Sequence, residues 1–396
     1  MSFRRMVIFF SCLIFAGSVI GLSGCTAGAN PALRNVTALT NARLIDGSGA
    51  GPVEDAVLLI QDGRILAAGK KGGVSIPAGA RVIDVGGGTI LPGFINAHVH
   101  AAYNEQHLKA WVDGGVTTVR DEAIIAIAPL PELMEFRKLT SDDAHLARLV
   151  SAGRMIGVPN GYGSLFVTSP DDARQKVLDE LAAGVDQIKL SLEDGYAGTS
   201  GLPKLNAAEL SAIITTAHEQ KVRVSGHITQ ARYLDLLVDA GVDDIAHLAY
   251  DPISAETLQK MVEKDIYLVP TFTVLHNYNA PMGPCTENLA KFTRLGGKVA
   301  LGNDYTGGPG NFELGIPMYE IQMMSQSAMT PMQIIVASTK NAAHVVGLEK
   351  EIGTLEVGKI ADVLVVNGNP LEDLQTLADL RMVIHNGKIV IPEAAE

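Results

Sequence analysis

The chain is 396 residues long, is 47% hydrophobic and 19% charged, and carries a formal net charge of −12 at pH 7. This acidic balance excludes nucleic acid as a partner, because a nucleic-acid surface needs clustered lysine and arginine side chains. The composition is that of a globular α/β protein. After an N-terminal leader about 370 residues remain, which is enough for one large core and a smaller second domain.

The first residues have the pattern of an export signal. Arg4 and Arg5 precede an almost wholly apolar run over 7–22, and Leu-Ser-Gly-Cys follows at 22–25. A short apolar run at the very N-terminus that ends in small residues is typical of a cleaved signal rather than of a membrane span. An ordinary secretory signal and an uncleaved anchor are the alternatives to the lipoprotein signal described next.

The residues around Cys25 resemble the lipobox of bacterial lipoproteins, in which the cysteine is lipidated and becomes the new N-terminus. We therefore expect a signal peptide over 1–24 and a tether over 25–35. The protein would be extracytoplasmic and lipid-anchored, on the periplasmic face of an outer membrane or on the cell surface. Of the remaining cysteines, one lies in the signal and the other is Cys285, so the mature domain has no pair to form a disulfide.

Both ends of the mature chain read as short strands. Over 36–93, alternating apolar runs are separated by Asp-Gly and Gly-Gly turns, and the same style returns over 350–396, where Asn386-Gly387 marks a hairpin. We predict that 36–93 and 350–396 form one small β-sandwich domain together.

The middle of the chain alternates strand and helix, which predicts a parallel sheet with crossover helices. The predicted strands lie at 94–100, 117–121, 147–153, 186–190, 222–227, 243–247, 267–271 and 298–304. Eight such units predict an α/β fold in which 94–349 forms a (β/α)8 TIM barrel. A doubly wound open sheet is the alternative.

Residues that can bind metal lie at the carboxyl ends of these predicted strands, where the active sites of such barrels are found. The first strand ends in Pro-Gly-Phe-Ile-Asn-Ala-His-Val-His, so two histidines at i and i+2 lie on one face of it. Alone, this pair could also occur by chance in a surface strand. Its partners at the other strand ends favour a metal site, and the full set is His98, His100, Lys189, His227, His247 and Asp304.

With this set of residues the chain resembles the amidohydrolase superfamily, in its binuclear-metal subtype. Within that superfamily it resembles the members similar to imidazolonepropionase and Xaa-Pro dipeptidase. The segments that carry the resemblance are 92–100, 115–121, 186–190, 226–227, 241–247, 268–271, 301–304 and 337–366. The resemblance implies that His98, His100 and Asp304 bind one metal ion, that His227 and His247 bind a second, and that a carboxylated Lys189 bridges the two.

The chemistry of these side chains agrees with the implied centre. A protonated lysine would repel two dications, whereas a carbamate formed from CO2 supplies one oxygen to each. Carboxylation needs the neutral amine, which burial of Lys189 would favour. Imidazole nitrogen and carboxylate oxygen suit Zn²⁺, with Mn²⁺ or Co²⁺ as alternatives.

We therefore expect a metal-dependent hydrolase that cleaves the C–N bond of a small-molecule substrate, a dipeptide or an N-acyl amino acid. A hydroxide that bridges the metals would attack, with Asp304 as general base and then general acid. Three alternatives stay open: a lactone, ester or phosphotriester hydrolase on the same centre, a mononuclear deaminase or imidazolone ring-opening enzyme, and a non-catalytic surface lipoprotein that binds ligand or metal. Assembly into a homo-oligomer also stays open.

Substrate contacts are less well marked. Arg154, Tyr162 and His276 follow predicted strands, and we predict them as substrate contacts. A structural salt bridge is an equally natural role for Arg154. Many dipeptidase-like relatives carry an oxyanion donor where this chain has Thr229, and they usually have glutamate where it has Ala246. The oxyanion donor must therefore come from a residue other than Thr229. The substrate is less firmly predicted than the reaction class.

Overall fold

The computed structural model describes residues 35–124, 128–195, 200–308, 310 and 312–392. The predicted signal peptide, Cys25 and most of the predicted tether lie outside these residues. Among the helices that the model describes, none combines the length and the apolar character needed to cross a membrane.

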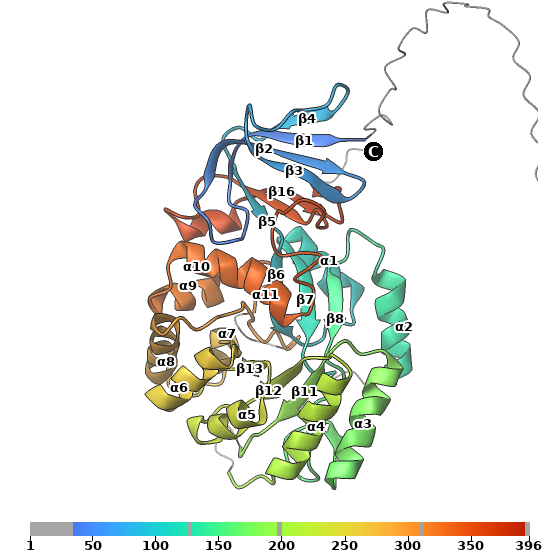
Figure 1. Cartoon of the computed structure of the whole chain (residues 1–396), viewed down its shortest axis with the longest axis vertical. Coiled ribbons are helices and arrows are strands. Elements are labelled where there is room, and N and C mark those ends of the chain that lie inside the picture. The colour runs from blue at the N-terminus through green and yellow to red at the C-terminus, as the bar shows by residue number, and fades with distance from the viewer. Residues whose placement is uncertain (1–34, 125–127, 196–199, 309, 311, 393–396) are drawn as a thin grey trace, which may run out of the picture. The chain divides into compact units, whose positions relative to one another are not determined.

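Strands from both chain ends pair in one eight-stranded sheet. Its strands are β1 (Thr37–Leu44), β2 (Val53–Gln61), β3 (Arg64–Lys70), β4 (Arg81–Asp84), β5 (Thr89–Pro92), β15 (Val363–Val366), β16 (Leu380–His385) and β17 (Lys388–Ile391). The order is β17-β16-β15-β5-β1-β2-β3, with β4 paired to β1. We predicted a two-layered sandwich from the sequence; the hydrogen-bonded pairing joins the strands of both ends in a single sheet (Figure 1).

The antiparallel pair of β5 with β15 joins the two ends at the centre of this sheet. Ile90 lies opposite Val365 and Leu91 lies opposite Leu364. Ile90 and Val365 are buried in a cluster that side chains from both chain ends share. Burial of this apolar surface stabilises the domain, because neither end could cover its own strands alone.

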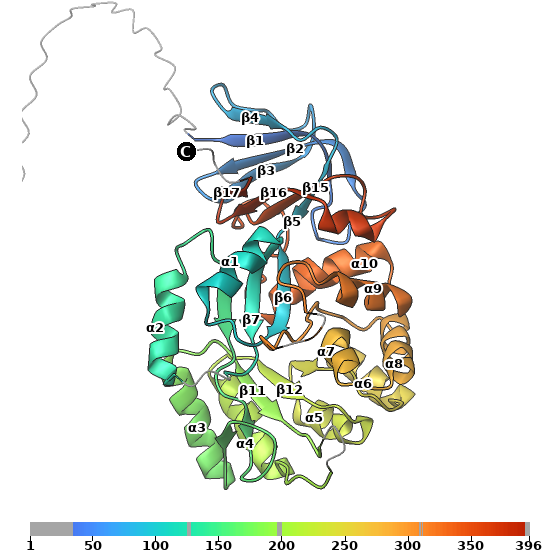
Figure 2. The same ribbon diagram turned by 180° about the vertical axis from the view of Figure 1, so that it is seen from behind.

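The middle of the chain forms parallel strands flanked by helices (Figure 2). The strands are β6 (Phe94–Val99), β7 (Val116–Asp121), β8 (Arg148–Ser151), β9 (Ile156–Gly157), β10 (Leu165–Phe166), β11 (Ile188–Ser191), β12 (Val224–His227), β13 (Asp244–Ala246) and β14 (Tyr267–Val269). They pair in two sheets, β6-β7-β8 and β10-β9-β11-β12-β13-β14. All of the strand pairs in these two sheets are parallel.

The segment predicted as the eighth strand, 298–304, is extended but is not assigned as a strand. Its backbone bonds to both neighbours: Ala300 N donates to Leu268 O at 3.0 Å, and Ala97 N donates to Leu301 O at 2.7 Å. On the other side, the backbone N–H groups of Asp186 and Gln187 donate to Ser151 O. Backbone hydrogen bonds thus connect the two parallel sheets at both of their junctions.

Helices connect the strands. They are α1 (Glu105–Asp113), α2 (Leu130–Thr140), α3 (Pro170–Ala183), α4 (Ala207–Glu219), α5 (Leu234–Ala240), α6 (Ala255–Glu263), α7 (Phe272–Asn277), α8 (Met282–Arg294), α9 (Met318–Gln326), α10 (Pro331–Val336) and α11 (Ala342–Val345). Helix α3 shows why the sequence folds this way locally. The Ser169 side chain accepts from Asp172 N, Pro170 occupies the first turn, and Gly184 ends the helix with φ 103°.

Candidate metal centre and substrate cavity

Three of the predicted ligands converge at one point. His98 lies on β6 and His100 follows that strand at i+2, so both rings point to the same side. Asp304 ends the extended segment beside β6, and its backbone N–H donates to His98 O at 2.8 Å. Asp304 Oδ1 lies 3.4 Å from His98 Nε2 and 3.1 Å from His100 Nε2. Donor atoms of the three residues fall within 4.8 Å of one another.

His227 and His247 join this group from the neighbouring strands. His227 ends β12 and His247 follows β13 directly. Their ring centroids are 4.5 Å apart, and the His247 ring lies 4.8 Å from that of His98. His247 Nδ1 is 3.7 Å from Asp304 Oδ2. The fold therefore brings five predicted ligands together, from strands far apart along the chain.

The donor atoms fit a divalent metal. His227 Nε2 and Asp304 Oδ1 are buried and have no hydrogen-bond partner among the described residues. Buried polar atoms without partners are costly, and a metal is one way to satisfy them. His100 Nδ1 lies 2.8 Å from Ala123 O and must donate to it, because a carbonyl only accepts. With a metal bound and Nε2 deprotonated, this hydrogen bond would leave the Nε2 lone pair of His100 for the ion, the usual second interaction of a ligating histidine.

The charges at the site suit the same role. Burial, together with the nearby Lys189, holds the pKa of His98 well below its usual range, and burial beside His227 does the same for His247. Both imidazoles are therefore neutral at neutral pH, which is the form that binds metal. Burial opposes the charge on Asp304, but His100 outweighs it and lowers the pKa of Asp304 to about 2. The carboxylate is ionised and can act as a ligand or a proton acceptor.

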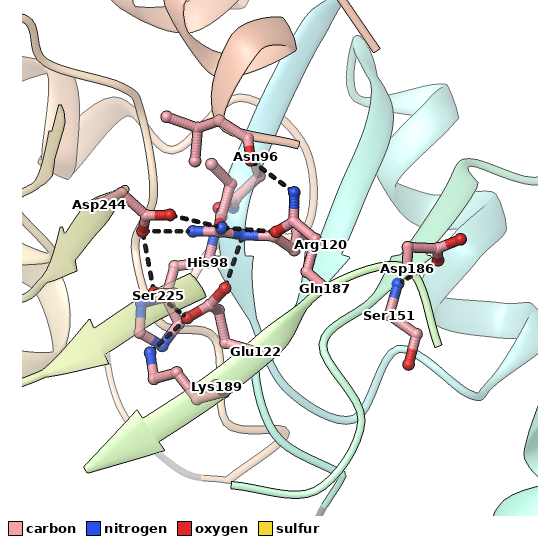
Figure 3. Close-up of polar contacts among 12 residues, drawn as sticks. Asn96, His98, Arg120, Glu122, Ser151, Asp186, Gln187, Lys189, Ser225 and Asp244 are labelled. Atoms are coloured by element: carbon pink, nitrogen blue, oxygen red, sulfur yellow. Dashed lines mark hydrogen bonds and ion pairs between the residues drawn. The ribbon is translucent and has the colours of Figure 1, made fainter. Parts of the chain in front are cut away.

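Lys189 lies on β11 beneath this cluster, and its ammonium contacts the carboxylate of Glu122 (Figure 3). Both side chains are fully buried. Glu122 also accepts a hydrogen bond from Ser225 Oγ at 2.8 Å, and its second oxygen lies 2.6 Å from Arg120 Nε. Arg120 in turn forms a two-pronged ion pair with Asp244, both contacts being 3.0 Å. Lys189 is thus one member of a buried network of alternating charges.

Glu122 was not among the residues singled out from the sequence. It follows β7 directly, at a carboxyl strand end like the predicted ligands. The Val-Arg-Asp-Glu run at 119–122 was therefore a usable signal, since a carboxylate at that position lies at the edge where the predicted ligands meet.

A cavity of about 610 Å³ opens over the ligand cluster. The predicted ligands form its floor, and its wall includes Tyr162, Thr229, Gln230 and Tyr250. A volume of this size accommodates a small organic molecule.

The three predicted substrate contacts have different outcomes. Tyr162 lines the cavity, with its ring centroid 4.8 Å from that of His227. Arg154 is turned away, because its Nε and backbone N–H both bond Glu180, which is buried, at 2.8 and 3.0 Å. The His276 ring lies 5.2 Å from that of Tyr319. In the described part of the chain, neither Arg154 nor His276 belongs to the cavity wall.

The Thr229 side chain is hydrogen-bonded to Glu193, a second residue that was not predicted from the sequence. Its Oγ1 donates to Glu193 Oε2 at 2.7 Å, and the same oxygen lies 3.3 Å from His227 Nε2. Glu193 follows β11 and is buried. The Thr229 hydroxyl is therefore committed to Glu193, and Ala246, buried in β13, has no side-chain donor.

Known proteins share this architecture. The family model described as Amidohydrolase family matches residues 89–390. The ochratoxinase of Aspergillus niger is 24% identical over 422 aligned residues, which cover 88% of this chain and 85% of the ochratoxinase. The imidazolonepropionase of Symbiobacterium thermophilum is 25% identical over 390 residues, covering 80% of this chain and 85% of that enzyme.

Among solved structures, a putative prolidase from Bifidobacterium longum superimposes with a TM-score of 0.78 at 26% identity, covering 91% of this chain and 95% of the prolidase. The resemblance inferred from the sequence motifs is confirmed by these matches. Because the family model spans most of the chain, including every predicted ligand, the chain belongs to the amidohydrolase family.

Proposed function

We propose that the chain is a metal-dependent hydrolase that cleaves the C–N bond of an amide, and that its parallel strands form the (β/α)8 barrel expected from the sequence. The observation that carries the proposal is the convergence of His98, His100, His227, His247 and Asp304 on one buried point, with donor atoms left without protein partners. The hydrogen bonds of 298–304 to its two neighbouring strands support the closed barrel.

The metal centre would be binuclear. His98, His100 and Asp304 would hold one ion and His227 and His247 the other, with Lys189 bridging them once it has been carboxylated by CO2. Zn²⁺ fits the nitrogen-rich donor set best, and Mn²⁺ or Co²⁺ would also suit it. When bound, divalent ions activate water near neutral pH and polarise a carbonyl group.

Asp304 would move the proton. Its carboxylate is ionised and lies at the floor of the cavity, so it can accept a proton from the attacking water. When the C–N bond breaks, the leaving nitrogen needs a proton, which Asp304 would return. His100, 3.1 Å from Asp304 Oδ1, would orient the carboxylate in the metal-free protein.

The substrate expected from the sequence, a dipeptide or an N-acyl amino acid, carries a carboxylate. The similarity to a putative prolidase supports a peptide-like substrate. Among the described cavity-wall residues, however, Lys189 is the one with a lysine or arginine side chain, and its ammonium contacts Glu122. We therefore propose amide hydrolysis as the reaction and derive the substrate class separately below.

Metal content tests the proposal. We expect close to two divalent ions per chain, loss of amide hydrolysis on chelation, and recovery with Zn²⁺ or Mn²⁺. His98→Ala should lose both metal and activity while the melting temperature of the metal-free protein stays near that of the metal-free wild type. His145→Ala is the matched control, because His145 is exposed and remote from the cluster. One ion per chain would favour the mononuclear deaminase or imidazolone ring-opening reading, and none would favour a binding protein.

We also propose that the protein is extracytoplasmic and attached to a bacterial membrane through a lipid on Cys25. The support is the sequence pattern of the leader alone, namely the basic start, the apolar run and Leu-Ser-Gly-Cys at 22–25.

A further inference from the structure

Much of the cavity wall is apolar or aromatic. Met155, Val274, Leu275 and Pro281 line the cavity, and so do Tyr162, Tyr250 and Tyr278. Val274 and Leu275 belong to α7 and are buried. A wall of this kind binds an apolar or aromatic group, because such a group leaves water on binding.

Helix α7 is held firmly in place. Glu320 on α9 is fully buried, and its carboxylate accepts hydrogen bonds from Phe272 N, Thr273 N and Thr273 Oγ1, each at 2.8 Å. These bonds satisfy the first N–H groups of α7, which a helix cannot satisfy internally. The apolar wall is therefore a built part of the site.

Cations near the cavity are already paired with protein carboxylates. Arg154 bonds Glu180, and Arg232, which follows β12, bonds Asp194. Among the described residues that line the cavity, a substrate carboxylate would meet no lysine or arginine side chain except Lys189, and an unpaired charge is costly to remove from water. The arrangement disfavours a substrate with a carboxylate next to the scissile amide.

The cavity wall also includes polar groups, among them the Tyr250 hydroxyl. The Tyr250 hydroxyl oxygen accepts a hydrogen bond from Gln230 Nε2 at 2.7 Å. Gln230 Nε2 also donates to Gly195 O at 3.2 Å, which fixes the orientation of the amide. Because the Tyr250 oxygen is the acceptor here, its own proton remains for a ligand acceptor such as a carbonyl oxygen. Tyr250 can therefore supply the donor that Thr229, committed to Glu193, cannot.

We propose that the site takes an uncharged amide with an apolar or aromatic group beside the scissile bond, its carbonyl oxygen hydrogen-bonded by Tyr250. This inference rests on the proposed amide hydrolysis and replaces the dipeptide or N-acyl amino acid as its substrate. In the reaction, the oxygen of water bonds to the carbonyl carbon, the C–N bond breaks, and the products are a carboxylic acid and an amine.

A matched pair of substrates tests the substrate class. N-benzoylphenethylamine and N-benzoylphenylalanine differ only by a carboxylate. With the full-length zinc-loaded protein, kcat/KM should be higher for the uncharged amide by at least about tenfold, or about 1.4 kcal/mol. Equal rates or a preference for the carboxylate would overturn this inference and leave the amide hydrolase standing. If the protein hydrolyses neither of these two substrates nor any other amide, the proposed function itself would be overturned.

Variants of the wall separate the charge effect from changes of shape. Ala280 lies at the cavity wall and is half-buried. Ala280→Arg should shift the ratio of kcat/KM values at least about tenfold toward the carboxylate substrate, whereas Ala280→Met, of similar length without charge, should leave the ratio near the wild-type value. An unchanged ratio in a stable Ala280→Arg protein would contradict the charge argument.

Tyr250→Phe tests the donor. It should lower kcat/KM for the uncharged amide by about 10²-fold, the usual order for a hydrogen bond to a developing oxyanion, mainly through kcat. Metal content and melting temperature should match the wild type. Tyr319→Phe, outside the cavity wall, is the control and should keep full activity. Wild-type kcat in Tyr250→Phe would show that the hydroxyl does not contact the reacting carbonyl.

Discussion

The structure places Lys189 in surroundings that differ from those expected from its sequence neighbours. From the sequence it was flanked by apolar neighbours, which would favour a neutral amine. In the fold it contacts Glu122, inside a network that also holds Arg120 and Asp244. Breaking one member of a buried ion pair typically costs about 3–5 kcal/mol, because the remaining charge is left unpaired. Variants at Lys189 must therefore separate a loss of metal from a loss of stability.

Lys189→Ala should lose metal and activity if the residue bridges two ions as a carbamate. Short carboxylates such as acetate should partly restore both, and Lys189→Arg should fail because guanidinium forms no carbamate. The double variant Lys189→Ala with Glu122→Gln removes the carboxylate charge that has lost its lysine partner. It should recover part of the melting temperature, because Arg120 keeps its ion pair with Asp244, but it should not recover the metal. Elemental analysis and thermal unfolding measure the two effects. Wild-type metal content in Lys189→Ala would refute the bridging role.

Glu320 gives a pH-dependent prediction. Burial raises its pKa from 4.5 to about 7, despite the hydrogen bonds it accepts. The folded state therefore holds this proton more tightly than the unfolded state, and the free energy of unfolding should fall as pH rises from about 4.5 to 7. The contribution is up to about 3 kcal/mol.

Glu320→Gln should flatten this part of the stability profile, since the amide does not titrate. Thermal unfolding of both proteins between pH 4.5 and 8 gives the comparison. An identical slope in the variant would show that another group is responsible.

At the scale of elements, the strand ends turn sharply at the site. His247, Thr271 and Asp304 have φ values of 76°, 53° and 54°. Positive φ is uncommon for residues other than glycine and is a clear outlier for a β-branched residue such as Thr271. Strain of this kind persists where the surrounding structure holds it and clusters at functional sites. Here it aims His247 and Asp304 at the common point.

Thr271 also fixes the His247 ring, since its Oγ1 lies 2.8 Å from His247 Nδ1. Thr271→Val keeps the shape but removes the hydroxyl, so metal affinity should fall about 10- to 100-fold. Thr271→Ser retains the hydroxyl and should bind metal nearly as well as the wild type. Competition with a chelator of known affinity measures the difference. Equal affinities in the two variants would mean that the hydrogen bond does not position the ligand.

The eight-stranded sheet and the parallel strands are also tied at element scale. Arg148 on β8 contacts Asp362, just before β15, at 2.7 Å, and Asn386 N donates to the same carboxylate at 2.9 Å. Burial opposes the charge of Asp362, but Arg148 holds the pKa of Asp362 below its usual range. This contact links the parallel strands to the sheet that both chain ends build.

For the whole molecule, we propose that the leader attaches the protein to a membrane. Cys25→Ser should abolish lipidation and either release the protein from the membrane fraction or leave an unprocessed precursor. Cys285→Ser is the control, because Cys285 is buried in α8 and should not affect attachment. Cell fractionation and mass spectrometry of the N-terminus measure both variants. If Cys25→Ser is processed and fractionates like the wild type, the lipoprotein assignment is wrong.

The sequence by itself determined the amidohydrolase family and the alternation of strands and helices, and it predicted the strand ends that carry the candidate ligands. This was possible because each signal is local: His98 and His100 share a strand face by spacing alone, and the carboxyl ends of parallel strands meet at one edge. The extended segment 298–304 shows the limit of such signals. It forms too few backbone pairs to be a regular strand, yet Asp304 lies at the predicted site.

Only the tertiary structure decided which side chains complete the site. Arg154 turns to Glu180, 26 residues away, and Lys189 meets Glu122, 67 residues away. Glu193 and Tyr250 face the same cluster from different loops. Polar side chains on loops can reach several partners. A buried charge pairs with an opposite charge, because leaving it unpaired costs free energy. That choice depends on distances across the fold, which no periodicity in the sequence contains.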